Sequence, residues 1–211
     1  MISRNLWNAN SDLKTACLQH PFVQGIATGT LPLACFRYYV SQDAFFLTAF
    51  ARAYSIAAAK TPDWEGFTTF HSLGDGVVEE LRLHQSYAAE WEVDLQQIQP
   101  GIATRRYTDF LLATAWGKDV GLTTAAMTPC LRLYAFLGQS LAQSQTSAHQ
   151  YSDWIKTYND AAFETLAQQL EDLMNRYITY QETEASSIYR YAMECELEFF
   201  EAAWCSQSSN F

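Results

Sequence analysis

Apolar residues recur every three or four positions along almost the whole 211-residue chain, and this spacing is typical of amphipathic helices. The sequence contains no convincing alternating strand segment and no Asn-Gly or Asp-Gly hairpin between β-branched runs. Short breaks such as Lys60-Thr61-Pro62-Asp63 and Gln99-Pro100-Gly101 separate the helical segments. The sequence therefore predicts an all-α bundle of about seven or eight helices. Because no linker divides it, we expect one domain over residues 1–211.

Three of the predicted helices are long. The first of these runs from about Leu33 to Ala59, and the next from about Trp64 to Leu95 with a bend at Gly74-Asp75-Gly76. The last runs from about Glu182 to Trp204. Most of the residues that attract attention for their chemistry lie on these helices or on the apolar segment that contains Pro129.

Charge and cysteine content restrict the classes of partner. The net charge is -10 and the pI is about 4.7, so a phosphate backbone would be repelled and nucleic acid is not an expected partner. The N-terminus lacks a signal-peptide core, and no uninterrupted apolar run is long enough to span a bilayer, so no membrane partner is expected. An odd number of scattered cysteines fits free thiols in a reducing cytoplasm. These are Cys17, Cys35, Cys130, Cys195 and Cys205.

Asp43 interrupts an apolar stripe on the helix predicted from Leu33. Phe46, Leu47 and Phe50 continue this stripe at helical spacing, and Phe36, Tyr39 and Val40 precede it. An ionised carboxylate in an apolar setting is costly unless a protein group or a ligand compensates it. Asp43 is therefore a candidate site residue, with an internal ion pair or hydrogen bond as the alternative.

Glu196 repeats this pattern on the last predicted helix. Tyr189, Met193 and Phe200 share its face, whereas the neighbouring acids group on another face that can be solvated. The alternative is a core glutamate paired with a buried arginine or tyrosine, since buried acids are rarely left unpaired.

Cys130 follows a proline inside the apolar segment from Leu122 to Leu141. Pro129 either bends the helix or restarts it, because it removes the hydrogen bond to the carbonyl of Ala125. After a restart, Thr128 would cap the new helix and its positive end would favour a Cys130 thiolate. The alternative is an inert core cysteine behind a structural kink.

Other motifs are weaker. His84 follows Glu80 by four residues, a spacing that two metal ligands on one helix face can have, but the remaining histidines do not complete such a site. We expect His84 to be a structural, hydrogen-bonded residue and expect no metal or cofactor. The Gly74-Asp75-Gly76 element lacks the strand and the Gly-Lys-Ser/Thr of a phosphate loop, and no serine nucleophile elbow is present.

Motifs in order along almost the whole chain resemble those of the TenA family of thiaminases and aminopyrimidine hydrolases, in its cysteine-containing branch. They are His20-Pro21-Phe22, Gly29-Thr30-Leu31-Pro32, Tyr39-Val40-Ser41-Gln42-Asp43, Tyr107-Thr108-Asp109-Phe110-Leu111, Thr128-Pro129-Cys130, Trp154-Ile155-Lys156-Thr157-Tyr158 and Glu196-Leu197-Glu198-Phe199-Phe200. The resemblance implies a haem-oxygenase-like helical fold, one TenA-like domain and a homo-oligomer, either a dimer or a tetramer.

The resemblance also implies roles for individual residues. Cys130 matches the nucleophile, Asp43 the acid that binds the exocyclic amine of the pyrimidine, and Glu196 the acid that contacts a ring nitrogen. The matched pocket and ring-packing positions are Phe46, Tyr107, Tyr134, Tyr158 and Phe199. Two positions depart from the pattern: Phe46 stands where many members have tyrosine, and Arg132 where many have tryptophan. Arg132 faces away from Cys130 on a helix, so we expect it to affect packing or assembly before chemistry.

The activity implied by the resemblance is hydrolysis of 4-amino-5-aminomethyl-2-methylpyrimidine to the 5-hydroxymethyl pyrimidine and ammonia, with cleavage of thiamin as a related reaction. Cys130 would add to the ring, and Glu196 would stabilise the charge that develops on a ring nitrogen. Two alternatives stay open at this point: a pyrimidine-binding or regulatory protein without catalysis, and a metal-dependent oxygenase on the same fold.

Overall fold

The computed structural model describes residues 1–90, 98–144 and 147–206, without the side chains of residues 82–90 and 144. The described backbone contains helices and no strand, which confirms the all-α prediction. It forms ten helices, more than the seven or eight expected, because the sequence predicts the break at His20-Pro21 but not those at Asn10 and Asn159-Asp160. The helices are α1 (Ile2–Ala9), α2 (Ser11–Gln19), α3 (Pro21–Thr28), α4 (Leu33–Lys60), α5 (Trp64–Glu90), α6 (Ile102–Gly117), α7 (Val120–Ser144), α8 (Ser152–Tyr158), α9 (Ala161–Tyr177) and α10 (Glu182–Cys205).

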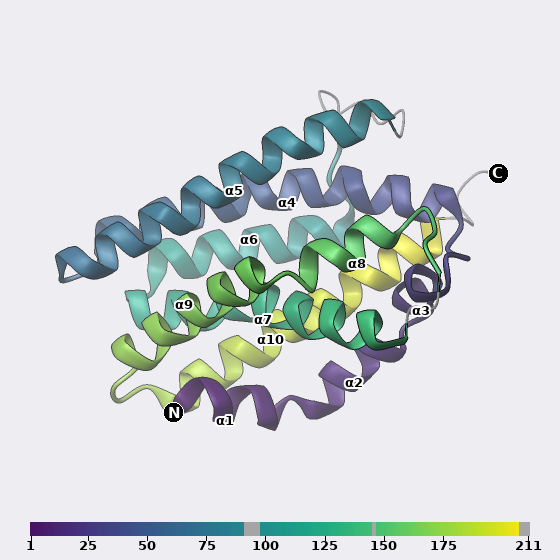
Figure 1. Ribbon diagram of the computed structural model, residues 1–211. Helices are drawn as coiled ribbons and strands as arrows, with labels where there is room; N and C mark the ends of the chain where they lie inside the picture. Colours follow the sequence, from purple (N-terminus) through teal and green to yellow (C-terminus); the bar gives the residue numbers. More distant parts are fainter. Residues whose placement is uncertain (91–97, 145–146, 207–211) are drawn as a thin grey trace.

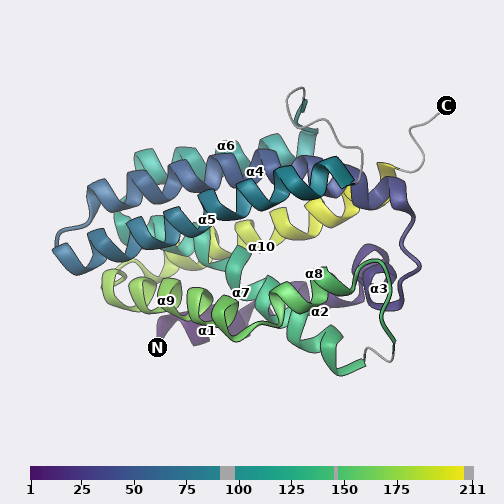
Figure 2. The ribbon, with the colours of Figure 1, turned by 45° about the horizontal axis from the view of Figure 1, so that its top comes forward.

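The helices form a bundle with α7 and α10 near its centre. Helices α4, α5 and α6 lie along one side, and α9, α8, α1 and α2 lie along the other (Figures 1 and 2). Helix α7 contacts α9, α10 and α8, while α4 contacts α5 and α6. Residues that are distant in the sequence, such as those of α4 and α10, are therefore brought together in the interior.

The long helices follow the predicted boundaries closely. Both α4 and α10 end one residue beyond the prediction, and α5 begins at Trp64 as expected. Helix α5 is continuous through Gly74 and Gly76, although each helical glycine costs about 1 kcal/mol relative to alanine, and a bend there stays a prediction. Burial of the neighbouring Leu73 and Val77 offsets part of this cost. The predicted end of this helix at Leu95 lies outside the described residues.

Gln42 fixes the beginning of α6, which carries Tyr107. Its side-chain oxygen accepts hydrogen bonds from the backbone N–H of Gly101 at 2.8 Å and from the Thr104 hydroxyl at 2.7 Å. Its amide nitrogen donates to the carbonyl of Gln99 at 3.2 Å. Because Gln42 precedes Asp43 on α4, the same turn that carries the buried acid also anchors the neighbouring helix.

Helix α7 continues through Pro129 and runs without a break from Val120 to Ser144. Of the two alternatives, a restart with Thr128 as its cap is therefore excluded. The Thr128 hydroxyl instead donates to the carbonyl of Thr124 at 2.7 Å, inside the helix. Cys130 consequently lies in mid-helix, where the positive end of a helix dipole is not available to stabilise a thiolate.

Helix α7 also corrects the expectation that no segment is apolar and long enough to span a bilayer. Residues Val120–Gln143 reach that length and hydropathy, but 83% of the apolar window is buried inside the protein. Such burial on all sides is expected of the central helix in a soluble helical bundle.

Two apolar clusters form the core, and the chemistry-bearing residues lie where they meet. One cluster includes Tyr134 and Phe199, and it packs the N-terminal helices against α7, α8 and α10. The other includes Phe46 and Tyr107, and it packs α4, α5 and α6 against α7 and α9. The boundary between them contains the buried acids Asp43 and Glu196, which are 6% and 2% exposed.

Candidate active site

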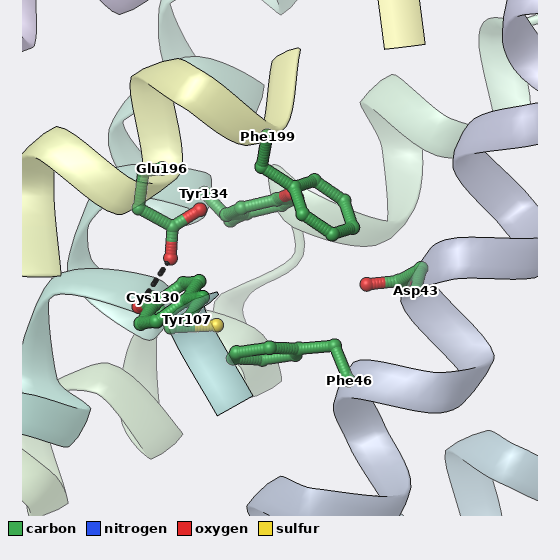
Figure 3. A pocket seen from close by; sticks show the side chains of 7 residues that line it. All are labelled: Asp43, Phe46, Tyr107, Cys130, Tyr134, Glu196 and Phe199. Atoms are coloured by element: carbon green, nitrogen blue, oxygen red, sulfur yellow. Dashed lines mark hydrogen bonds between the residues drawn. The ribbon is translucent and has the colours of Figure 1, made fainter. Parts of the chain in front are cut away.

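Four helices contribute to one small cavity in the centre of the bundle. The cavity is lined by Asp43 and Phe46 from α4, Tyr107 from α6, Cys130 and Tyr134 from α7, and Glu196 and Phe199 from α10. Figure 3 shows Asp43 on one side and Glu196 with Cys130 on the other, with the rings of Phe46 and Phe199 between them. The arrangement offers polar groups at two ends of an aromatic slot, which suits a flat polar ring.

Glu196 is held by Tyr107. The Tyr107 hydroxyl donates a hydrogen bond to Glu196 Oε1 at 2.8 Å (Figure 3). Burial raises the pKa of Glu196 to about 8, and the nearby Asp43 contributes to this rise. The hydrogen bonds from Tyr107 and Cys130 act in the opposite direction, because they stabilise the carboxylate. Glu196 can thus exchange a proton near neutral pH, as an acid–base catalyst must.

Cys130 is a thiol in the resting protein. Burial raises its pKa well above the usual value, and the negative charges of Glu196 and Asp43 raise it further. Its hydrogen bond to Glu196 also favours the protonated sulfur. Although protein surrounds it, Cys130 keeps partial exposure because it faces the cavity. The thiol and the carboxylate are therefore paired so that a proton can pass from sulfur to oxygen.

Aromatic rings set the height of the slot. Phe46 packs on Tyr107 with ring centroids 4.7 Å apart and lies 6.3 Å from the ring of Phe199. Phe50 stacks behind Phe46 at 5.3 Å. These contacts leave the rings little rotational freedom, so the walls are preorganised before a ligand enters.

The structure brings seven of the eight sequence-predicted site residues to the cavity wall. The eighth, Tyr158, is not among the lining residues, because its ring packs against the far side of Tyr134 with centroids 4.8 Å apart. Sequence reasoning assigned no site role to Tyr39 and Trp154, which contact Tyr134 from behind. The one sequence signal for such a role is the position of Tyr39, which lies one helical turn before Asp43.

Gly138 allows α8 to approach α7 closely enough to support Tyr134. A Cβ at this position would lie 2.3 Å from the backbone carbonyl carbon of Tyr158. We therefore expect Gly138→Ala to displace α8, to lower the free energy of unfolding by about 1–3 kcal/mol and to reduce ligand binding. Chemical denaturation measures the first effect. Gly76→Ala is the matched control, since its Cβ meets nothing within 4 Å, and it should leave stability unchanged or raise it by about 1 kcal/mol. Equal effects of the two variants would contradict this role of Gly138.

Arg132 points away from the cavity, as its spacing from Cys130 predicts. Its guanidinium binds Glu171 through two hydrogen bonds of 3.0 and 2.9 Å and Glu164 through bonds of 2.8 and 3.0 Å. Its side chain is only 13% exposed. Such bidentate pairing ties α7 to α9 behind the cysteine and makes Arg132 a packing residue.

Glu80 and His84 have the spacing of two metal ligands on one helix face. The side chain of His84 lies outside the described residues, so its structural role stays a prediction. Among the described residues, no group of three or more His, Cys, Asp or Glu side chains is arranged to hold a metal ion.

A model of the TENA/THI-4/PQQC family matches residues 7–206, which is nearly the whole chain and includes every residue of the cavity. The chain belongs to the TENA/THI-4/PQQC family. This membership accounts for the ordered set of motifs from His20 to Phe200. It does not by itself assign a role to any of the cavity side chains.

Named relatives and a solved structure agree with this membership. The chain is 38% identical over 208 residues to the "Bifunctional TH2 protein, mitochondrial" of Arabidopsis thaliana, covering 86% of this chain and 34% of that protein. It is 34% identical over 162 residues to the "Aminopyrimidine aminohydrolase" of Bacillus subtilis, covering 75% of this chain and 67% of that enzyme. The "TenA homologue protein from P.horikoshii OT3" superimposes with a TM-score of 0.92 at 24% identity, over 98% of this chain and 99% of that one, and so shares the fold.

Several curated relatives are much longer than this chain. It spans 34%, 28% and 26% of the lengths of three of them, among which is the plant protein. The fold shared with TENA/THI-4/PQQC structures is also seen in a domain of unknown function with a haem-oxygenase-like fold from Shewanella denitrificans, with a TM-score of 0.77 at 9% identity. The haem-oxygenase-like architecture expected from the sequence is thereby confirmed.

Proposed function

We propose that this protein hydrolyses 4-amino-5-aminomethyl-2-methylpyrimidine to the 5-hydroxymethyl pyrimidine and ammonia, as a step of thiamin salvage. One observation carries the proposal: a thiol, a proton-exchanging carboxylate and a second buried acid share one aromatic slot. The Bacillus subtilis relative is named "Aminopyrimidine aminohydrolase", which supports the same reaction class. The aromatic walls suit a pyrimidine ring, and thiamin cleavage is a related activity in this proposal.

The slot orients the substrate by its two polar ends. Asp43 accepts hydrogen bonds from the exocyclic 4-amine, and Glu196 contacts a ring nitrogen on the opposite side. Phe46 and Phe199 hold the ring between them. Tyr107 keeps the Glu196 carboxyl in place through its 2.8 Å hydrogen bond. In this pose Cys130 lies beside the ring carbon next to the substituted position.

The reaction begins with attack by sulfur. The Cys130 thiol gives its proton to Glu196 as the new S–C bond forms, and Glu196 gives a proton to the ring nitrogen that gains negative charge. The aminomethyl group carries a proton as an ammonium group, so the electrons of the dearomatised ring expel it from the 5-methylene as neutral ammonia and leave an exocyclic alkene. Water adds to this methylene as hydroxide, and its other proton passes to the released ammonia. Loss of sulfur and of the ring-nitrogen proton restores the aromatic ring and the starting thiol.

The role of Asp43 gives the sharpest test of substrate recognition. Asp43→Asn should lower kcat/KM for the aminomethyl pyrimidine about 100-fold, because a charge-assisted hydrogen bond to the 4-amine is lost. An analogue without the 4-amine should bind the wild-type protein weakly and lose little more with the variant. Kinetics and calorimetric titration measure these effects.

The control for this test is a measurement that the Asp43→Asn variant is folded. Circular dichroism should show that Asp43→Asn remains folded, since the change preserves size and removes a buried charge. If the variant unfolds, or if it discriminates against the des-amino analogue as strongly as the wild type does, Asp43 is a structural acid. Assays of thiamin and of a formylated aminomethyl pyrimidine beside the aminomethyl pyrimidine itself rank the three substrates.

We also propose that the chain acts as one TenA-like domain over residues 1–211, in the cytoplasm and as a homo-oligomer of two or four copies. Large apolar side chains are exposed on α5 and α6, and they are Trp64, Val78, Ile102 and Trp116. Exposed aromatic and aliphatic groups of this kind support a buried interface between subunits. The free cysteines support a reducing compartment.

A further inference from the structure

Four buried aromatic side chains pack together behind the cavity wall, and three of them form a hydrogen-bonded group. Tyr39 Oη lies 3.3 Å from Tyr134 Oη and 3.3 Å from the indole nitrogen of Trp154. Tyr158 packs against this group, with its ring centroid 4.8 Å from that of Tyr134 and 4.7 Å from that of Trp154. All four residues are less than 9% exposed, but Tyr134 alone among them lines the cavity. The group therefore joins α4, α7 and α8 at the one tyrosine that can touch a ligand.

The donors and acceptors of this group fix the direction of its hydrogen bonds. An indole N–H can only donate, so the Tyr39 oxygen accepts from Trp154. A phenol has a single hydrogen, so Tyr39 can donate once while it accepts from Trp154. The hydrogen of Tyr39 is then donated to Tyr134. Consequently the hydrogen of Tyr134 does not point back at Tyr39.

Packing holds this arrangement in place. The ring of Tyr39 lies 5.2 Å from that of Phe22 and 5.9 Å from that of Phe199. Trp154 and Tyr158 pack edge to face at 4.7 Å on one short helix. Because buried rings of this kind have few alternative rotamers, the bond direction is a property of the empty protein and needs no ligand.

We propose that Tyr39 and Trp154 are positioning residues that set Tyr134 as a hydrogen-bond donor into the cavity, directed at an acceptor atom of the bound pyrimidine. The acceptor is a ring nitrogen or the oxygen placed on the 5-methylene during the reaction. This inference rests on the proposed function. It adds that recognition depends on two residues outside the cavity, one of them on the helix that also carries Asp43.

A double-mutant cycle tests the inference. Tyr39→Phe removes one hydroxyl and should lower kcat/KM for the aminomethyl pyrimidine about tenfold, and Tyr134→Phe should lower it at least as much. Since Tyr39 acts through Tyr134, the double variant should be no worse than Tyr134→Phe alone. Losses that multiply to about 100-fold in the double variant would overturn the inference.

Tyr151→Phe is the matched control. Tyr151 is as buried as Tyr39, and its hydroxyl donates to the carbonyl of Leu31 at 2.6 Å, away from Tyr134. It should lower the unfolding midpoint as Tyr39→Phe does while leaving kcat/KM unchanged. Equal kinetic losses in both variants would reduce Tyr39 to a structural residue.

The cycle also separates this inference from the proposed function. If the wild-type protein turns over no aminopyrimidine, the proposed function fails, and the unfolding midpoints of the same four proteins are then compared. If the midpoint shifts of the two single variants do not add up in the double variant, the coupling between Tyr39 and Tyr134 is supported. Additive shifts reject it.

Discussion

Cys130→Ala is expected to lose turnover of the aminomethyl pyrimidine by about 10⁴-fold or more while the protein stays folded, because no other group can form the bond to the ring carbon. The cavity keeps Asp43, Glu196 and both phenylalanines, so binding of the hydroxymethyl product should change little. Steady-state kinetics and calorimetric titration separate these two quantities.

The matched control is Cys17→Ala. Cys17 is fully buried in the same apolar cluster as Phe22 and does not line the cavity, so its truncation should cost about 1 kcal/mol of stability and leave kcat intact. Turnover that survives in Cys130→Ala would refute the covalent mechanism. It would leave the cavity as a pyrimidine-binding site whose chemistry, if any, uses water alone.

The covalent mechanism depends on how the thiol is activated. A restarted helix would have supplied a positive dipole and a resting thiolate, but α7 is continuous and burial keeps Cys130 protonated. Activation therefore falls to Glu196, whose pKa of about 8 leaves roughly a tenth of it ionised at neutral pH. The thiol and the carboxylate form one proton-sharing unit, and a change to either should affect both.

The sequence predicted the fold well because apolar periodicity is a local signal. It located Asp43 and Glu196 for the same reason: each is an acid at a position where the helical stripe requires an apolar residue. The sequence left two alternatives open at Pro129, because a proline in an apolar run is compatible with either a restart or a bend, and the structure shows a continuous helix.

The hydrogen-bonded group behind Tyr134 could not be predicted. Tyr39 and Trp154 read as ordinary core aromatics, and they lie 115 positions apart in the sequence. Their meeting depends on the close approach of α8 to α7 at Gly138, which is a tertiary contact without a periodic signature. For the same reason, Tyr158 was predicted to line the cavity, whereas it packs against Tyr134 and is not among the lining residues.

Glu196→Gln is expected to reduce kcat/KM by about 10²–10⁴-fold, because the amide can neither take the thiol proton nor return it to the ring nitrogen. The wild-type profile should rise with pH through about 8, as the carboxylate that accepts the proton is formed. This ascending limb should be absent from Glu196→Gln. Glu198→Gln, on the same helix but in a half-exposed pair with Arg106, is the control and should keep the limb.

As pH rises, the free energy of unfolding of the wild type should fall while its kcat/KM rises. The folded protein holds a proton on Glu196 up to a pH of about 8, whereas the unfolded chain releases it near the ordinary value of 4.5. The wild-type free energy of unfolding therefore falls across this interval as pH rises. Glu196→Gln has no such penalty, so it should exceed the wild type by more than about 1 kcal/mol at the upper end and match it below the lower end. Denaturation series at several pH values measure the difference.

Tyr107→Phe decides whether the ascending limb belongs to Glu196. The Tyr107 hydroxyl donates to the carboxylate and so lowers the pKa of Glu196 against the effect of burial. Removing this hydrogen bond should shift the limb to higher pH, in addition to any loss in the maximal rate. A limb that stays in place in Tyr107→Phe, or that persists in Glu196→Gln, would assign the titration to another group. The thiol would then need a proton acceptor other than Glu196.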